Sequence, residues 1–258
     1  MNHVLVKVCG VRTPEDARVA ADVGADLIGL VFAPSSRRVT IETAVSIADR
    51  VRSHRAQAPA LVGVFVNEPV DRIVEICDRL DLAAVQCHGD EPPEVIAAIG
   101  RPVVKALRLG STANLYDARR AAERYLDSAV PAIALLIDSH VPGHYGGTGT
   151  RGNWEITARL AEEYPVILAG GLCPETVRAA IETVLPLGVD VSSGVETGGI
   201  KDHDKIRSFV GAARRADAPA LAGRHEARRS MFSPRSPVRR GYPDSGMSRV
   251  SQRNEEQS

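Results

Sequence analysis

The sequence lacks the features of a membrane, secreted or metal-scaffold protein. No run of about 18 apolar residues exists, which excludes a transmembrane helix. The first ten residues lack the basic region and cleavage site of a secretory signal. The four cysteines (Cys9, Cys77, Cys87 and Cys173) form no C-x-x-C pair, so we expect neither a zinc site nor disulfides. This cysteine usage is typical of a protein in the reducing cytoplasm.

Charge of one sign is also not in excess. The 258 residues contain 32 Lys plus Arg and 32 Asp plus Glu, so net charge does not indicate a nucleic-acid or acidic-membrane partner. The balance shifts at the end of the chain, because residues 217–258 hold eight arginines against five carboxylates. This segment is rich in Ser, Pro and Arg and has no apolar periodicity. We therefore predict a folded domain over 1–216 and a disordered tail over 217–258.

What is present within 1–216 is an alternation with a period of about 27 residues. Short apolar runs rich in β-branched residues alternate with segments of helical period. The predicted strands are 4–9, 26–33, 60–66, 82–87, 102–109, 132–138, 165–170 and 188–193. The predicted helices are 14–24, 41–53, 70–80, 92–100, 113–128, 153–164, 174–185 and 201–215, with Thr13, Asn153 and Pro174 as start signals and Gly24 as a stop signal.

Eight strands, each followed by a helix, are typical of a single (β/α)₈ barrel of the TIM type. A doubly wound open sheet is the alternative, but its G-x-G-x-x-G sequence is missing after the first strand. We therefore predict the barrel.

In such barrels the chemistry lies where the strands end. Cys9 ends the first predicted strand and Asp138 ends the sixth, and a thiol and a carboxyl can share proton transfers across one substrate. Each also has a structural interpretation, because cysteine is often a small core residue and Asp138 can support a turn.

Glycine and serine follow the last two predicted strands. Gly170 and Gly171 come after the seventh, and Ser192, Ser193 and Gly194 after the eighth. Such turns expose backbone N–H groups that suit a phosphate, although they can also be simply tight turns.

Eight segments in register identify the chain as similar to a known family. KVCGVRTPEDA, GADLIGLVFAPSSRRV, VGVFVN, VQCHGDE, LLIDS, GGTGT, ILAGGLCPE and VDVSSGVETGGIKD occur in this order between residues 7 and 202. Together they resemble phosphoribosylanthranilate isomerase, the (β/α)₈ enzyme of tryptophan biosynthesis.

The resemblance implies an Amadori rearrangement of N-(5-phosphoribosyl)anthranilate to 1-(2-carboxyphenylamino)-1-deoxyribulose 5-phosphate, with neither metal nor cofactor. By the same resemblance Cys9 is the general base, Asp138 the general acid, and Arg38 the residue that holds the anthranilate. The phosphate contacts fall on Gly170 and Gly171 and on the turn formed by Ser192, Ser193 and Gly194. A cytoplasmic monomer or homodimer is expected.

The chain departs from the family pattern in the loop over 146–153, where a Lys and a Phe are missing, and at Cys87 and Cys173. The loop departure leaves the ligand contacts of 146–153 open. His88 is expected to line the site or to support a turn, and Cys77 and Trp154 to pack in the core.

Lys7 has the same two-residue parity as Cys9, so both side chains should point into the barrel. Asp190 on the eighth strand lies beside the first strand once the barrel closes. We therefore predict a buried ion pair between Lys7 and Asp190 beneath the site.

Two other functions remain open. The first is a related phosphosugar isomerase on the same barrel, such as the imidazole-carboxamide isomerase of histidine biosynthesis. A resemblance to that enzyme would imply an acid–base pair of two Asp residues, at the ends of strands one and five. This chain has Cys9 and Arg108 there. The second is a non-catalytic barrel that binds a phosphorylated metabolite.

Overall fold

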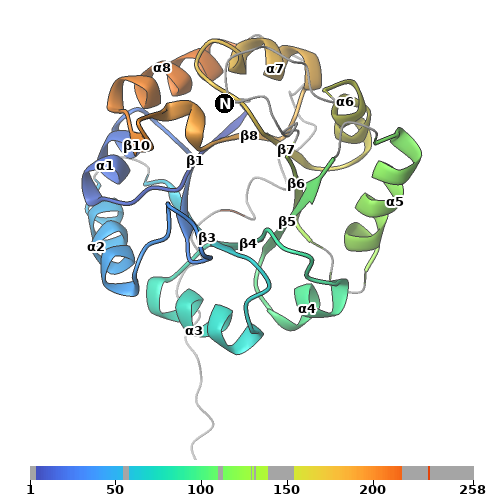
Figure 1. Cartoon of the computed structure of the whole chain (residues 1–258), viewed down its shortest axis with the longest axis horizontal. Coiled ribbons are helices and arrows are strands. Elements are labelled where there is room, and N and C mark those ends of the chain that lie inside the picture. The colour runs from blue at the N-terminus through green and yellow to red at the C-terminus, as the bar shows by residue number, and fades with distance from the viewer. Residues whose placement is uncertain are drawn as a thin grey trace, which may run out of the picture.

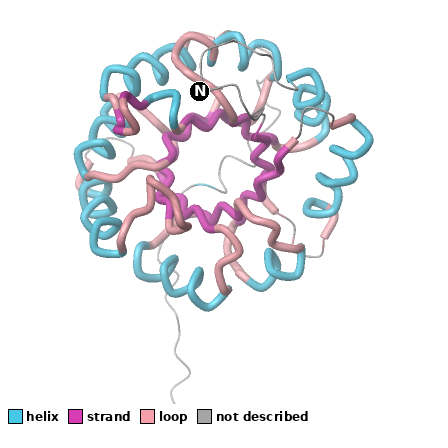
Figure 2. Tube along the Cα trace, in the orientation of Figure 1, coloured by secondary structure: helices cyan, strands magenta, loops and turns pink. Residues whose placement is uncertain are grey.

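The computed structural model describes residues 4–54, 58–109, 113–128, 130, 132–138, 154–216 and 232. In this part of the chain eight parallel strands form a closed barrel, as predicted, and eight helices surround it (Figures 1 and 2). The strands are β1 (Leu5–Cys9), β2 (Leu27–Val31), β3 (Ala60–Phe65), β4 (Ala84–Cys87), β5 (Val103–Arg108), β6 (Ala134–Asp138), β7 (Val166–Ala169) and β8 (Gly188–Val191). The helices are α1 (Pro14–Asp22), α2 (Ile41–Arg52), α3 (Val70–Leu80), α4 (Pro93–Ala98), α5 (Leu115–Leu126), α6 (Trp154–Glu163), α7 (Val177–Val184) and α8 (His203–Arg214).

The barrel closes through the pairing of β1 with β8. Lys7 lies opposite Asp190 in this register, and Leu5 lies opposite Gly188. Because side chains alternate along a strand, the register places the odd-numbered residues of β1 inside the barrel and the even-numbered ones outside. The sequence pattern therefore determines which side chains face the site.

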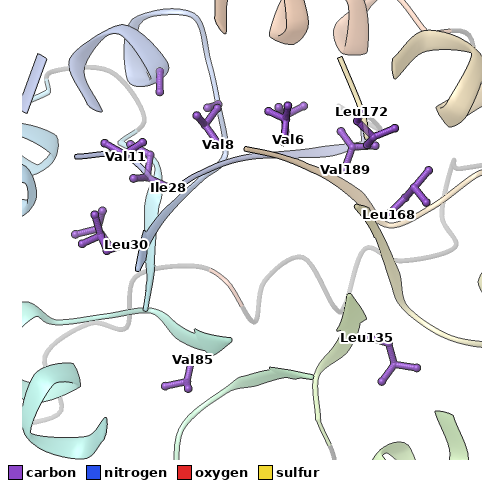
Figure 3. Packing of buried hydrophobic residues seen from close by; sticks show 14 of the residues in the cluster. Val6, Val8, Val11, Ile28, Leu30, Val85, Leu135, Leu168, Leu172 and Val189 are labelled. Carbon is purple, nitrogen blue, oxygen red and sulfur yellow. The ribbon is translucent and has the colours of Figure 1, made fainter. Parts of the chain in front are cut away.

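The apolar core has two parts. The outward-facing strand residues, such as Val6, Ile28 and Leu135, pack against the ring of helices (Figure 3). A separate inner cluster fills the amino-terminal part of the barrel lumen. Because both faces of every strand are covered, the strands are continuous apolar runs rather than alternating ones.

Local signals explain most helix boundaries. The Thr13 hydroxyl accepts a hydrogen bond from the Asp16 N–H at 3.1 Å and caps α1, and Gly24 follows that helix with φ of +82°. Pro174 was expected to open the seventh helix, but α7 begins at Val177, after a short turn. Asn153, the expected start signal of α6, lies outside the described residues.

Between β8 and α8 the chain forms elements that the periodicity did not indicate. A short 3₁₀ turn, η1 (Ser193–Val195), is followed by a two-stranded hairpin of β9 (Glu196–Thr197) and β10 (Ile200–Lys201). No helix in the described part of the chain is long and apolar enough to cross a membrane.

Candidate active site

A cavity of about 330 Å³ opens at the carboxyl ends of the strands. Its volume lies at the lower end of the range for small-molecule sites. All the candidate site residues except Arg38 line it. The lining residues are Cys9, Val31, Ala33, Pro34, Ser35, Arg37, Val64, Val66, Gln86, His88, Asp138, Ala169, Gly170, Gly171, Leu172, Asp190, Val191, Ser192, Ser193 and Gly194.

The Cys9 thiol lies above the predicted ion pair. Lys7 Nζ is 2.9 Å from Asp190 Oδ1, and Lys7 is 2% exposed, so the prediction of a buried pair is confirmed. The Lys7 ammonium also lies close to the Cys9 side chain, and the charges of the two groups interact. A Cβ atom on Gly29 of β2 would lie 2.8 Å from Cys9 Sγ and 3.0 Å from Lys7 Nζ. Glycine at this position therefore leaves the room in which thiol and ammonium meet.

Burial and charge act in opposite directions on these groups. Burial raises the pKa of the Cys9 thiol above its ordinary value, and the Lys7 ammonium opposes that rise. Burial lowers the pKa of Lys7, but Asp190 and Cys9 together outweigh burial, so its pKa is raised. Lys7 is therefore a permanent cation at neutral pH, placed where a thiolate would need one.

Asp138 lies at the end of β6, with a side chain that is 26% exposed. His88 Nε2 is 4.0 Å from Asp138 Oδ2, and His88 Nδ1 is 2.9 Å from Gln86 Nε2. Burial lowers the pKa of His88, so its imidazole is neutral at pH 7. Of the two expectations for His88, lining the site and supporting a turn, the structure bears out the first, and the imidazole is an ionisable neighbour of the candidate acid.

The glycine turns after β7 and β8 have the geometry that phosphate loops require. Gly170 and Gly171 have φ of +88° and +66°, which favours glycine. A Cβ atom on Gly194 would lie 1.8 Å from the Leu172 carbonyl oxygen, so the two loops are in backbone contact. The N–H groups of Gly171, Ser193 and Gly194 make no backbone hydrogen bond within the described residues. These N–H groups are therefore available to an anion.

The hairpin after η1 braces the β8 loop through a cluster of charges that the sequence analysis missed. Lys201 Nζ donates to the Ser192 carbonyl at 2.9 Å and lies 2.7 Å from Glu196 Oε1. Arg37 donates to both carboxylate oxygens of Glu196, at 2.7 and 2.6 Å. The two cations lower the pKa of Glu196 to about 2. The only sequence signal was the pair of glycines at 198–199, which marks a turn.

The structure separates the two arginines of the loop after β2. Arg37 lines the cavity, and Glu196 holds its guanidinium group. Arg38 is exposed and does not line the cavity, and its side chain makes no hydrogen bond in the described part of the chain. Its N–H donates to the Ser35 carbonyl at 3.1 Å. The assignment of the anthranilate contact to Arg38 stays a prediction.

The remaining cysteines and the tryptophan do not line this cavity. Cys77 and Cys87 are buried in the outer core, and burial raises their pKa values to about 11 and about 12. Trp154 is partly buried and packs against the same core, as predicted. Among the described residues no group of three or more His, Cys, Asp or Glu side chains is placed to hold a metal ion. The loop over 146–153 lies outside the described residues.

Comparison with known proteins adds an independent observation. Residues 6–212 match the family model of N-(5'-phosphoribosyl)anthranilate (PRA) isomerase. The N-(5'-phosphoribosyl)anthranilate isomerase of Roseiflexus castenholzii is 48% identical over 217 residues, which cover 83% of this chain and 99% of that protein. The protein of the same name from Desulforudis audaxviator is 44% identical over 82% of this chain and 98% of its own length.

Solved structures agree with the sequence comparison. The phosphoribosyl anthranilate isomerase of Thermotoga maritima has a TM-score of 0.70 and 38% identity, and the match covers 81% of this chain and 98% of that one. A structure of phosphoribosyl anthranilate isomerase with reduced 1-(o-carboxyphenylamino)-1-deoxyribulose 5-phosphate has a TM-score of 0.67, 36% identity and the same coverage. Since the family model spans most of the chain and the relatives align over nearly their whole length, this chain belongs to the N-(5'-phosphoribosyl)anthranilate isomerase family.

Proposed function

We propose that the protein converts N-(5-phosphoribosyl)anthranilate to 1-(2-carboxyphenylamino)-1-deoxyribulose 5-phosphate by general acid–base catalysis, as a step of tryptophan biosynthesis. One observation carries the mechanism: the Cys9 thiol and the Asp138 carboxyl, which come from β1 and β6, line a single cavity beside two glycine-rich turns. Acid and base on different strands can act on different atoms of one sugar.

Asp138 begins the reaction as the acid. Its proton goes to the furanose ring oxygen while the bond between that oxygen and C1 breaks. The lone pair of the anthranilate nitrogen forms the new C1=N bond, which gives an open-chain, protonated imine. Opening the ring makes the C2 proton acidic, because the electrons left behind can move into the C=N bond.

Cys9 then acts as the base. Its thiolate removes the proton from C2, a C1=C2 double bond forms, and the nitrogen recovers its lone pair. The resulting enolamine, which has a hydroxyl on C2, tautomerises to the ketone product. No electrons leave or enter the substrate overall, so the proposed reaction uses no redox cofactor and assigns no step to a metal.

Lys7 supports this step as a positioning residue. Its ammonium lies beside the Cys9 side chain, where its charge acts on the thiol, and is itself held by Asp190 at 2.9 Å. A fixed cation beside the sulfur stabilises the thiolate relative to the thiol. Burial and the Asp190 charge both oppose this effect, so the reactive form depends on the Lys7 ammonium.

The two ends of the substrate have separate candidate contacts. The N–H groups of Gly171, Ser193 and Gly194 suit the 5-phosphate, because backbone donors bind an anion without needing a side-chain charge. For the carboxylate of the anthranilate we propose Arg38, whose planar guanidinium matches a carboxylate. Arg37 is less suited, since Glu196 already accepts from its Nε and Nη2 groups, which form one face of the guanidinium fork.

The proposed ligand is a small phosphoribosyl compound, with neither nucleic acid nor membrane as a partner, and the proposed location is the cytoplasm. One related structure is described as monomers generated from a dimeric phosphoribosylanthranilate isomerase of Thermotoga maritima. A monomer or a homodimer is proposed for this chain.

The test is an assay with freshly made phosphoribosylanthranilate, in which conversion is followed as loss of the substrate's fluorescence. Arg38→Ala should raise KM by about 10- to 100-fold, as expected for loss of a charge-assisted hydrogen bond of about 1.5–3 kcal/mol. Arg38→Lys should restore binding in part. A normal KM in Arg38→Ala with a raised KM in Arg37→Ala would transfer the contact to Arg37.

The assay also separates the alternatives. Binding without turnover would indicate a phosphometabolite-binding barrel. Turnover of the histidine-pathway aminoimidazole-carboxamide substrate alone would indicate the related isomerase. The structure speaks against the latter, because β1 ends in Cys9 and β5 in Arg108 rather than in two aspartates.

A further inference from the structure

The amino-terminal end of the barrel, opposite the cavity, is lined by three alanines together with larger residues such as Leu5 and Leu27. The first residues of β3, β4 and β6 are Ala60, Ala84 and Ala134, and all three belong to the inner apolar cluster. TIM-barrel interiors are normally filled by bulky branched residues from the strands themselves. Three alanines contribute less apolar volume here than branched residues would.

A residue from far along the chain is buried in this cluster. Phe232 is 4% exposed and packs with the inner cluster, whose other members all come from strands or their immediate flanks. A phenylalanine side chain is the largest purely apolar group available and buries about 150–250 Å². It therefore supplies apolar volume that the alanines do not contribute.

The chain leaves the barrel at this same end. Arg214, the last residue of α8, donates to the Val4 carbonyl at 2.6 Å and to Asp26 Oδ2 at 2.7 Å. Val4 and Asp26 immediately precede β1 and β2, so they mark the amino-terminal end of the barrel. Fifteen residues separate Ala216 from Phe232. At about 3.3 Å per residue this is enough chain to reach from the end of α8 to the amino-terminal opening of the barrel.

This feature is additional to the family fold. The family model ends at residue 212, and the 217 residues matched to the Roseiflexus castenholzii relative account for 99% of that protein. Phe232 thus lies 20 residues beyond the segment that the family model matches. Of the segment 217–258, for which the sequence predicts disorder, only Phe232 is among the described residues.

We propose that Phe232 is an intramolecular plug: the segment after α8 docks this one side chain into the amino-terminal opening of its own barrel and stabilises the fold from the end opposite the active site. The amino-terminal face of such barrels contributes to stability and the carboxyl-terminal face to catalysis. The plug should therefore affect unfolding and leave substrate turnover unchanged.

The experiment uses the full chain with Phe232→Ala, Phe232→Leu and, as a matched exposed-aromatic control, Tyr116→Ala, since Tyr116 is 67% exposed. We expect Phe232→Ala to lower Tm by about 5 °C, Phe232→Leu to lower it by less, and Tyr116→Ala to change it by under about 2 °C. The kcat/KM of all three should match the wild type at 25 °C. A Tm for Phe232→Ala within about 1 °C of the wild type would overturn the proposal.

Limited trypsin digestion tests docking itself. The chain has arginines on both sides of Phe232, at 229 and 235, and one near its end, at 253. Cleavage after Arg229 and Arg235 should be several-fold slower in the wild type than in Phe232→Ala, while cleavage after Arg253 should be equal in both. If wild type and Phe232→Ala are cleaved at the same rate at each of the three sites, docking is contradicted. Protection that increases with protein concentration would place the side chain in a second copy and overturn the intramolecular plug.

Discussion

The buried pair of Lys7 and Asp190 allows the sharpest test of how stability and chemistry are linked in this barrel. In Lys7→Met the side chain stays unbranched, is one atom shorter and loses its charge, which leaves the Asp190 carboxylate buried without its cation. Removing one partner of a buried ion pair costs about 3–5 kcal/mol. For a domain of this size that corresponds to a fall in Tm of about 6–20 °C.

A second buried pair provides the matched control. Lys105 Nζ is 2.9 Å from Glu91 Oε2, and both side chains are 2% exposed, as for Lys7. Lys105 does not line the cavity and is not among the charges that act on Cys9. Lys105→Met should therefore destabilise the fold by a similar amount and leave the chemistry of the thiol unchanged.

The two variants should differ at Cys9. The Lys7 ammonium lowers the pKa of the thiol against the effect of burial, so Lys7→Met should raise that pKa further. The thiolate fraction at pH 7 then falls, and kcat/KM falls with it. The assay is the pH dependence of thiol alkylation, taken as the difference between each variant with and without Cys9→Ser. If Lys7→Met leaves the alkylation profile where it was, the role of Lys7 in activating the thiol is refuted, whatever happens to Tm.

The pH dependence of stability tests the charge state of Lys7. The pKa of Lys7 is raised in the folded protein, so the pair stabilises the fold fully at neutral pH and loses its effect only as pH rises through that raised pKa. The comparison is with a Lys7→Met, Asp190→Asn double variant, which leaves no lone carboxylate to titrate, and the difference in Tm from wild type should be constant between pH 6 and 8, because Lys7 stays charged throughout. A difference that shrank within this window would show that Lys7 titrates near neutrality.

Three further results are expected. Cys9→Ser and Asp138→Asn should each lower kcat/KM at least about 100-fold and remove one limb of a bell-shaped pH profile, and near-full activity in either would reassign its proton transfer. Gly194→Ala must move one of two loops in backbone contact, so it should raise KM and lower stability by about 1–3 kcal/mol in urea unfolding; an unchanged KM would separate this turn from phosphate binding. Glu196→Gln should be less stable than wild type at pH 7, because Arg37 and Lys201 stabilise the ionised form of Glu196. The difference in unfolding free energy should shrink as pH falls from the ordinary glutamate range toward 2, where Glu196 becomes protonated in the folded protein. A difference that is the same at pH 2 would contradict that pKa.

Most of the fold and much of the site could be predicted because strands in a barrel obey a strict local rule. The alternation of apolar runs with helical segments indicates eight βα units, and the structure has them within a few residues of the predicted bounds. The two-residue period places Lys7 and Cys9 on the inner face together, and closure of the barrel then brings Asp190 beside Lys7. Strand ends of parallel strands meet at one edge, which is why Cys9 and Asp138 share a cavity.

The sequence by itself therefore determined the barrel, its inward-facing residues and the edge at which its chemistry lies. Only the tertiary structure decided how loop and terminal side chains are used. It placed Arg37 rather than Arg38 on the cavity wall, held it with Glu196, and seated Phe232 among strand-start alanines. The physical reason is that side chains in loops and in the terminal segment have no fixed period, so their long-range contacts depend on which surfaces the closed fold leaves open.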